Sequence, residues 1–272
     1  MGIVNASPDS FSDPGARTLD ALTADALAQV EAGADMIDVG GESGVTHTPP
    51  VPAAEERERV VPLVERLVAE GVTVSVDTWK AEVAEAALAA GAALINDVSG
   101  LRDPAVADAC ARNGAGLVVM HTRAEPKVKA FPGYDDVVED VRAFLAERIT
   151  LARSRGVAAD RIVVDPGPDF AKTPAETVVA LRALSELRRL GQPLLLAVSR
   201  KDFVGALTGR RPAERLGGTL GAIAAVGRHA DILRVHDVAA VADFLRVREA
   251  LEAENGNVPA LDVSLRTEDP VA

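Results

Sequence analysis

Short apolar segments recur along the chain, and each is followed by a polar residue. They occupy residues 1–5, 36–39, 72–76, 93–95, 116–120, 162–164, 193–198 and 232–235. Short, often β-branched segments bounded by glycine or polar residues are typical of fully buried parallel strands. The pattern therefore predicts a series of buried strands with polar ends.

Helical spacing of apolar residues separates these strands. The predicted helices span 19–32, 81–90, 104–112, 135–155, 173–190, 212–228 and 238–254, with one more opening at Pro52. Alternating strands and helices predict an α/β fold, a single (β/α)8 TIM barrel over residues 1–254, and an irregular C-terminal tail over 255–272. A doubly wound open sheet is the alternative, but its glycine-rich dinucleotide turn is missing after the first strand.

Composition excludes several classes of partner. The 272 residues are 48% hydrophobic and 26% charged, as in an ordinary globular protein, and the net charge of -12 argues against a nucleic-acid backbone as ligand. Cys110 is the only cysteine, so no internal disulfide is expected and a cytoplasmic location fits. No apolar run is long enough to cross a bilayer, so no membrane partner is expected.

The polar residues at the strand ends are the candidate chemistry. They are, in chain order, Asn5, Asp38, Asp77, Asn96, His121, Asp165, Lys201, Arg234 and His236. In a (β/α)8 barrel the C-terminal ends of the strands carry the functional groups. Aspartate and asparagine at such positions also cap helices, and for any one of them taken alone a capping role is favoured. Lysine, arginine and histidine do not cap helix N-termini, which favours a binding site at one mouth.

These residues fall into two groups by charge. A mixed donor and acceptor set, suited to a flat heterocycle, consists of Asp77, Asn96, Asp165 and Lys201. A second set, on the neighbouring first and last strands, suits a phosphate or pyrophosphate with a divalent cation and consists of Asn5, Arg234 and His236. No zinc-ligand spacing, nucleophile elbow or Walker loop is present. Charged pairs such as Glu55 and Glu56 are predicted to be solvated helix faces.

Motifs at these strand ends follow one another in a fixed order. They are Met1-Gly-Ile-Val-Asn-Ala-Ser-Pro-Asp-Ser-Phe-Ser-Asp13, Ile37-Asp-Val-Gly-Gly-Glu-Ser43, Ser75-Val-Asp-Thr78, Ile95-Asn-Asp97, Met120-His121, Asp165-Pro-Gly167 with Phe170 and Lys172, Ser199-Arg-Lys201, and Arg234-Val-His-Asp-Val238. In this order and spacing, from Met1 to about Leu251, the sequence resembles the dihydropteroate synthase family.

The resemblance implies a (β/α)8 transferase of folate biosynthesis. Members condense 6-hydroxymethyl-7,8-dihydropterin pyrophosphate with 4-aminobenzoate, giving 7,8-dihydropteroate and pyrophosphate with the help of Mg²⁺. By resemblance, the pterin-binding positions are Asp77, Asn96, Asp165 and Lys201, and the positions for pyrophosphate and magnesium are Asn5, Arg234 and His236, with Asn5 as the metal ligand. Phe170 and Lys201 match residues beside the aminobenzoate. The implied catalytic set is Asp77, Asp165, Lys201, Arg234 and His236.

The resemblance also implies a mobile first loop and a homodimer. Asp9, Ser10 and Phe11 match the loop that closes over the reacting centre. The predicted last helix carries an apolar stripe that suits either a dimer interface or packing against the barrel: Val238, Val241, Phe244, Leu245 and Val247.

Three departures from the family pattern keep alternatives open. The second loop reads Glu42-Ser-Gly-Val-Thr-His-Thr-Pro-Pro50 instead of Glu-Ser-Thr-Arg-Pro-Gly. In the sixth loop, Pro168-Asp-Phe-Ala171 replaces both later glycines, which is expected to place a side chain where backbone would approach the pterin. Met1 begins the first strand, where the family usually has a preceding hairpin. The alternatives are a divergent paralogue with weak or altered transferase activity and a methyltetrahydrofolate-type pterin-binding module, which needs no anion site.

Overall fold

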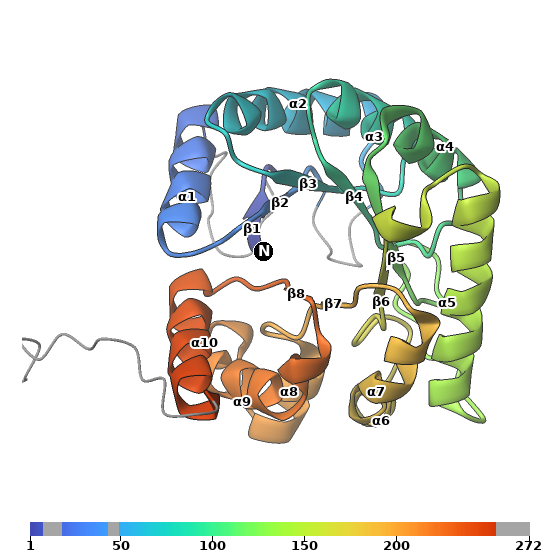
Figure 1. Cartoon of the computed structure of the whole chain (residues 1–272), viewed down its shortest axis with the longest axis vertical. Coiled ribbons are helices and arrows are strands. Elements are labelled where there is room, and N and C mark those ends of the chain that lie inside the picture. The colour runs from blue at the N-terminus through green and yellow to red at the C-terminus, as the bar shows by residue number, and fades with distance from the viewer. Residues whose placement is uncertain (8–17, 43–48, 254–272) are drawn as a thin grey trace, which may run out of the picture.

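Eight parallel strands form the inner layer of the fold in a computed structural model that describes residues 1–7, 18–42 and 49–253. Six of them pair in sequence order: β1 (Gly2–Asn5), β2 (Ile37–Gly40), β3 (Val74–Asp77), β4 (Leu94–Asp97), β5 (Gly116–Met120) and β6 (Ile162–Asp165). The remaining two, β7 (Leu195–Leu196) and β8 (Ile232–Leu233), pair with each other. Helices surround these strands on the outside (Figure 1).

Hydrogen bonds at two seams close the strands into one barrel. At the first seam, the N–H of Val164 in β6 donates to the carbonyl of Pro193 at 2.9 Å, and Val164 also bridges Leu194. At the second, the N–H of Val235 donates to the carbonyl of Met1 at 3.0 Å, and the amino group of Met1 donates to the carbonyl of Leu233 at 3.0 Å. The predicted (β/α)8 barrel is therefore confirmed, and the open sheet is wrong.

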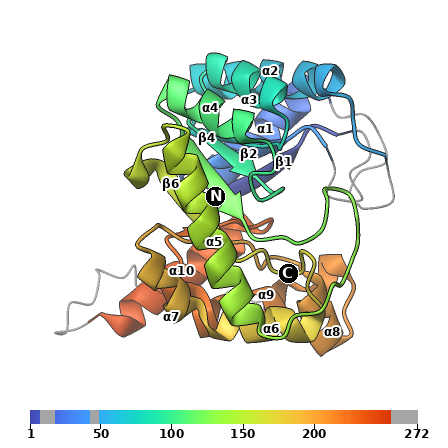
Figure 2. The ribbon, with the colours of Figure 1, turned by 90° about the vertical axis from the view of Figure 1, so that its right-hand side faces the viewer.

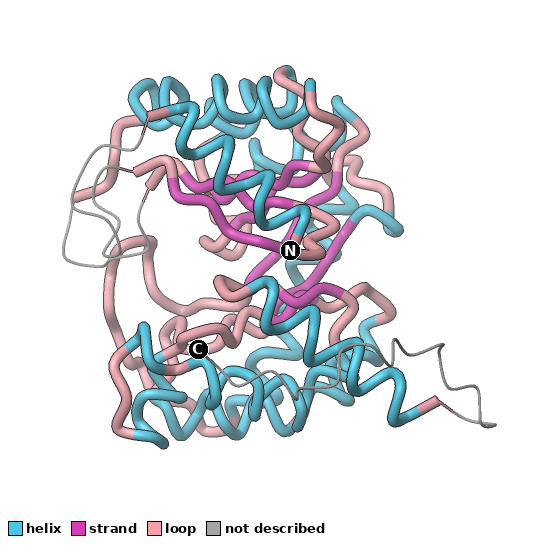
Figure 3. The backbone as a smooth tube through the Cα atoms, turned by 90° about the vertical axis from the view of Figure 1, so that its left-hand side faces the viewer, coloured by secondary structure: helices cyan, strands magenta, loops and turns pink. Residues whose placement is uncertain are grey.

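The outer layer consists of ten α-helices and four short 3-10 helices in the described part of the chain. They are α1 (Leu19–Glu31), α2 (Ala53–Ala69), α3 (Ala81–Ala89), α4 (Pro104–Asn113), α5 (Val137–Ser154), η1 (Ala159–Arg161), α6 (Pro174–Arg182), α7 (Leu184–Leu187), η2 (Arg188–Leu190), α8 (Asp202–Thr208), η3 (Pro212–Glu214), α9 (Leu216–Val226), η4 (Gly227–His229) and α10 (Val238–Glu252). Figure 3 shows this helical layer around the strands, and Figure 2 shows α5 along the side of the barrel. Each helix in the described part of the chain is too short or too polar to span a lipid bilayer.

Two helix predictions differ from the structure. The predicted helix over 173–190 divides at Ala183 into α6 and α7, and the one over 212–228 is a 3-10 turn followed by α9. The sequence pattern also missed α8. The N-cap position of α8, Lys201, makes no capping hydrogen bond with its side chain, and the first N–H groups of the helix are bound instead by Asp169 in a distant loop. A cap supplied by tertiary structure leaves no local signal.

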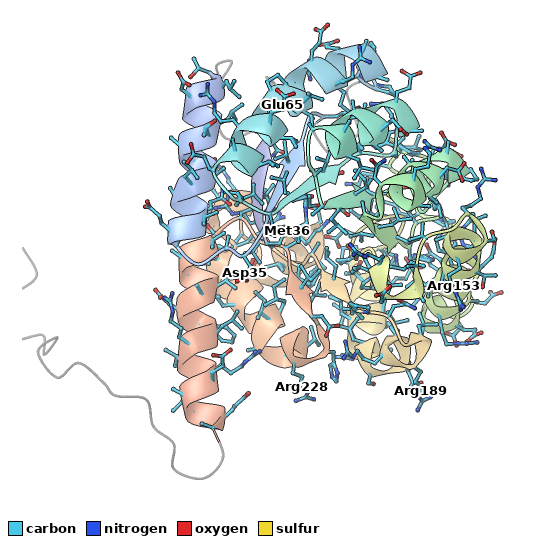
Figure 4. The ribbon with its side chains drawn as sticks, turned by 45° about the horizontal axis from the view of Figure 1, so that its top comes forward. Asp35, Met36, Glu65, Arg153, Arg189 and Arg228 are labelled. Atoms are coloured by element: carbon cyan, nitrogen blue, oxygen red, sulfur yellow. The ribbon has the colours of Figure 1, made fainter. Side chains whose placement is uncertain are left out.

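Apolar packing fills the barrel below the polar strand ends. A small cluster of Leu94, Val118, Val163, Leu195 and Ala197 lies apart from the large core between strands and helices. The opposite end of the barrel, where the strands begin, faces the viewer in Figure 4, with Met36 near its centre and Asp35 beside it. The predicted site residues Asn5, Asp77, Asn96 and Asp165 stand at the other end, as the last or next-to-last residues of their strands.

The apolar stripe on α10 is used largely by the barrel itself. Val238 and Val241 are buried, Phe244 and Leu245 are partly buried against the core, and Val247 is 60% exposed. The stripe therefore packs mainly inward. The boundary between barrel and tail stays a prediction, because residues 254–272 lie outside the described part of the chain.

Candidate active site

The strand register brings three predicted site residues to one level. Asn5 in β1 lies opposite Gly40 in β2, Gly40 lies opposite Asp77 in β3, and Asp77 lies opposite Asn96 in β4. Neighbouring strands are parallel, so residues in one row project to the same side of the sheet. Asn5, Asp77 and Asn96 therefore form one row at the polar end of the barrel.

A buried carboxylate, Asp38, is the centre of the polar network at this end. It accepts hydrogen bonds from Ser75 Oγ at 2.6 Å, from Asn96 Nδ2 at 3.1 Å and from Arg234 Nε at 2.6 Å. Arg234 also donates through Nη2 to Asp77 Oδ2 at 3.0 Å. The strand-end pattern included Asp38 but gave it no role, and its role depends on contacts with distant strands. The network therefore connects members of the two predicted groups, the one suited to a flat heterocycle and the one suited to a pyrophosphate.

Burial and neighbouring charges perturb the ionisation of this network. Burial raises the pKa of Asp77 to about 7; the charge of Arg234 opposes this shift and the charge of Asp38 adds to it. Burial disfavours the charged form of Arg234, but Asp38 and Asp77 outweigh that effect and raise the pKa of the guanidinium. Arg234 is therefore a permanent cation, whereas Asp77 takes up a proton near neutral pH.

The loop after β6 places Asp165. Its Oδ1 accepts the N–H of Gly167 at 2.7 Å, and burial raises the pKa of this carboxyl group against the effects of that hydrogen bond and of Lys201. Gly167 has φ +62°, and a Cβ at this position would lie 2.0 Å from the carbonyl oxygen of His121. Only glycine fits this turn, which sets the direction in which the chain leaves Asp165.

The two positions of the sixth loop at which the family pattern has glycine keep a backbone conformation that favours glycine. Asp169 has φ 66° and Ala171 has φ 54°, so both hold left-handed conformations. Ala171 is buried, and the carboxylate of Asp169 accepts the N–H of Asp202 at 2.5 Å. The added side chains thus leave the loop's turn in place, and the carboxylate of Asp169 is engaged by α8.

The buried side chain of Lys172 stabilises the same loop through hydrogen bonds to its backbone. Its buried Nζ donates to the carbonyls of Gly167 at 2.9 Å and Phe170 at 3.2 Å, and contacts His121 Nδ1 at 2.7 Å. Burial lowers the pKa of Lys172 to about 7. Burial and the charge of Lys172 lower the pKa of His121 to about 3, so its ring is neutral, and its Nε2 lies 2.8 Å from Asp140 on α5. His121 therefore belongs to the loop's support and lies outside the Arg234 network.

Lys201 and Phe170 meet as the resemblance implies. The Nζ of Lys201 lies 4.5 Å from the centroid of the Phe170 ring. Burial lowers the pKa of Lys201, while Asp169 and Asp165 counteract that shift. Within residues 1–7, 18–42 and 49–253, this ammonium group makes no hydrogen bond, which leaves its three donors for a ligand.

The ends of β7 and β8 are tied together by side chains. His236 Nδ1 lies 3.0 Å from Ser199 Oγ, and Arg200 forms a bidentate pair with Asp237 at 3.0 and 2.5 Å. Desolvation and the charges of Arg234 and Arg200 lower the pKa of His236 to about 4, although the residue keeps an exposed surface. His236 is therefore a neutral donor or acceptor at the rim.

The prediction of a solvated Glu56 is wrong. The side chain is fully buried, and Lys80 Nζ donates both to Glu56 and, at 2.6 Å, to Glu42. A Cβ on Gly41 would lie 2.7 Å from Val60 and 2.8 Å from Glu56, so glycine lets α2 approach this strand end. Together these contacts hold Glu42 at the start of the second loop. Residues 43–48 of that loop, and Asp9, Ser10 and Phe11 of the first, lie outside the described residues.

Comparison with known proteins extends the match beyond single motifs. The sequence profile of a family described as pterin binding enzymes matches residues 1–236. The dihydropteroate synthase of Synechocystis is 41% identical over 258 residues, which cover 92% of this chain and 89% of that protein. The Bacillus subtilis dihydropteroate synthase is 40% identical, with 94% and 89% covered. The chain belongs to the dihydropteroate synthase family.

Solved structures of dihydropteroate synthases share the fold. Xanthomonas albilineans dihydropteroate synthase with 4-aminobenzoic acid superimposes with a TM-score of 0.87 at 45% identity, over 93% of each chain. The same enzyme in complex with 7,8-dihydropteroate gives a TM-score of 0.84, also at 45% identity and 93% coverage of each chain. The predicted family, barrel fold and transferase function are confirmed. The roles of individual residues stay predictions.

Proposed function

We propose that this chain condenses 6-hydroxymethyl-7,8-dihydropterin pyrophosphate with 4-aminobenzoate to form 7,8-dihydropteroate and pyrophosphate. The observation that carries the proposal is the placement of Arg234. This cation lies between the buried carboxylate of Asp38 and the partly buried carboxylate of Asp77, and Asn96 donates to the same Asp38. A cation held beside ring-binding acceptors suits a substrate that joins a flat heterocycle to an anion.

The pterin ring is assigned to Asp77, Asn96, Asp165 and Lys201. Carboxylates accept the paired N–H donors of a pterin, the amide offers both a donor and an acceptor, and the ammonium donates to ring nitrogen or carbonyl oxygen. Asp165 is held by Gly167, and Lys201 makes no competing hydrogen bond among the described residues. The site is thus preorganised for the ring, which reduces the conformational cost of binding.

The leaving group is assigned to Arg234 and His236. Among the described residues, Arg234 donates only through Nε to Asp38 and through Nη2 to Asp77, so the other N–H groups of the guanidinium are left for the pyrophosphate. The bond between the pterin methylene carbon and the ester oxygen then breaks, and pyrophosphate leaves with the electron pair. The electron-rich pterin carries the positive charge until the arylamine nitrogen bonds to carbon and loses a proton. The protein contributes positioning and anion stabilisation.

The aminobenzoate is assigned to the neighbourhood of Phe170 and Lys201. The aromatic ring of Phe170 offers a flat apolar contact, and the ammonium of Lys201, 4.5 Å from its centroid, offers a hydrogen-bond donor. The second loop also belongs to this region in the family, and its altered residues 43–48 lie outside the described part of the chain.

Magnesium is assigned to Asn5. Mg²⁺ prefers oxygen ligands and uses few protein groups when substrate phosphates supply the rest. The described residues contain no group of three or more histidine, cysteine or acidic side chains able to hold a metal by themselves. Asn5, whose Oδ1 lies beside Gly40 at the end of β1, fits a site that is completed by pyrophosphate oxygens and water. A bound Mg²⁺ would neutralise charge on the leaving group.

Assembly and location follow the family and the composition. We expect a cytoplasmic homodimer, although the inward packing of Val238 and Val241 leaves little of the α10 stripe for an interface. Sedimentation at micromolar concentration tests the assembly, and a monomer would reject the dimer. A methyltetrahydrofolate-type module is disfavoured because it has no need of Arg234 and His236 beside the ring-binding groups.

Calorimetric titration tests the proposed division of labour. The wild-type protein should bind the pterin pyrophosphate more tightly than the pterin alcohol, and Arg234→Ala should remove most of that difference. Asp165→Ala should abolish binding of both ligands. Equal losses for the two ligands in Arg234→Ala would reject the assigned anion role, and a wild-type protein that binds neither would reject the function.

A further inference from the structure

Asp169 connects three elements around the candidate site. Its Oδ2 accepts the N–H of Asp202 at 2.5 Å, and both carboxylate oxygens lie 3.3 Å from the N–H of Phe203. Its own N–H donates to Thr177 Oγ1 in α6 at 3.1 Å. A residue of the loop after β6 is therefore bonded to the first turns of α6 and α8.

The bond to α8 replaces a cap that this helix lacks. α8 has seven residues, and Lys201 at its N-cap makes no side-chain capping bond. Free N–H groups at the start of a helix are well satisfied by a carboxylate, which also complements the helix dipole. Asp169 makes these bonds from φ 66°, a conformation that is unfavourable for residues other than glycine. The hydrogen bonds from the first N–H groups of α8 to Asp169 thus offset the cost of its left-handed backbone.

Two adjacent residues of the loop after β6 contact two adjacent residues at the start of α8. Asp169 binds the backbone of Asp202, and the ring of Phe170 lies under the ammonium of Lys201. On the other side, Arg215 Nη1 donates to the carbonyl of Lys201 at 3.1 Å. The peptide group between Lys201 and Asp202 is thus bound at its N–H by Asp169 and at its carbonyl by Arg215.

We propose that Asp169 is a positioning residue that holds Lys201 and Phe170 together as one preformed wall for the aminobenzoate and the pterin. This inference rests on the proposed function. Where the family usually has a flexible glycine, this chain has a carboxylate that locks the sixth loop to α8. The same charge opposes the effect of burial on Lys201 and so favours its ammonium form.

Three variants separate this role from general stability. Asp169→Gly removes the carboxylate and relieves the left-handed backbone, so folding should be preserved. Asp169→Asn keeps one acceptor oxygen and removes the charge. Ala171→Gly is the matched control, because it relieves the left-handed backbone two residues away, at φ 54°, without touching α8.

Steady-state kinetics give the first readout. The loss of one charge-assisted hydrogen-bonded contact predicts that Asp169→Gly raises the KM for 4-aminobenzoate by about tenfold. Asp169→Asn should recover part of this loss, and Ala171→Gly should stay within about twofold of the wild type. The alkaline limb of kcat/KM should move to lower pH in both Asp169 variants, because Lys201 loses a favourable neighbouring charge.

Amide hydrogen exchange gives a readout that does not need turnover. Exchange at Asp202 and Phe203 should speed up in Asp169→Gly and stay unchanged in Ala171→Gly. If the wild type shows no turnover, the proposed function fails, and faster exchange would still support the contact between the loops. Unchanged exchange in Asp169→Gly overturns the inference, and so does lower thermal stability with an unchanged KM and pH profile.

Discussion

Arg234 Nη2 donates to Asp77 Oδ2 at 3.0 Å, so the proposed anion-binding cation is already hydrogen-bonded to a proposed pterin ligand. The same guanidinium donates through Nε to Asp38 at 2.6 Å. The residues proposed to bind the two halves of the substrate therefore belong to one connected network. A ligand that binds Asp77 shares this carboxylate with Arg234, so we expect ring binding and anion binding to influence each other.

Removal of Arg234 should destabilise the fold through the carboxylates it leaves behind. Arg234→Ala leaves Asp38 buried and without its cation, which predicts a loss of about 3 kcal/mol in the free energy of unfolding. In an Asp38→Asn background the same substitution should cost about 1 kcal/mol, because no buried charge is stranded. Urea unfolding of the four proteins measures this coupling. Equal costs in both backgrounds would show that the Asp38 pair is not responsible.

Binding of the pterin ring should depend on the ionisation of Asp77. Its pKa of about 7 means that the carboxylate form, which accepts the ring N–H groups, is lost as the pH falls through 7. The association constant of a pterin without pyrophosphate should decrease roughly tenfold from pH 8 to pH 6. Calorimetry with this ligand avoids titration of the phosphates. Asp77→Asn should bind this ligand weakly, with an association constant that hardly varies between pH 8 and pH 6. If the variant keeps the tenfold decrease of the wild type, another group carries the titration.

Regular structure was largely predictable because its signals are local. Apolar runs identified the strands, and helical spacing identified most helices. The row of Asn5, Asp77 and Asn96 depends in addition on the strand register, which the structure supplies. Lys201 and Phe170 also meet as expected. Pattern and resemblance therefore located residues that lie together at the strand ends, while their contacts with ligands stay predictions.

Residues that support the site were harder to predict because their partners are distant. Asp38 is defined by Arg234, and α8 is capped by Asp169 from another loop. For Glu56, a local signal was available. It lies four and seven positions before Val60 and Leu63, which share its buried helix face, so helical spacing favoured burial over the solvated face expected from the acidic pair.

Lys172 should impose a pH dependence on stability. Its pKa is about 7 in the folded protein and 10.5 for an ordinary lysine, so the unfolded chain binds an extra proton between these values. This group therefore makes the free energy of unfolding increase with pH across that window, by at most about 1.4 kcal/mol per pH unit, and adds no slope below pH 7. Lys172→Met should abolish this increase in the free energy of unfolding, measured by urea unfolding between pH 7 and 10.

The matched control for that substitution is an exposed lysine. Lys129→Met removes a side chain that is 54% exposed and should leave the pH slope unchanged. If Lys172→Met and the wild type show the same slope, Lys172 does not carry the perturbed ionisation. Slower unfolding at all pH values in Lys172→Met would also contradict its proposed support of the loop.

Asn5 should affect the magnesium requirement more than pterin binding. Asn5→Ala removes the proposed protein oxygen, and the Mg²⁺ concentration for half-maximal activity should increase several-fold. Binding of a pterin without pyrophosphate should change little, because this ligand does not need the metal. A magnesium titration of activity that is identical in the variant and the wild type would remove Asn5 from the metal site.

The most direct measurement is a coupled assay of pyrophosphate release by the wild-type protein with the pterin pyrophosphate, 4-aminobenzoate and Mg²⁺ present. Release should require both substrates, yield 7,8-dihydropteroate in equal amount, and disappear in Asp165→Ala. Pterin binding without turnover would instead identify a divergent paralogue and contradict the proposed reaction.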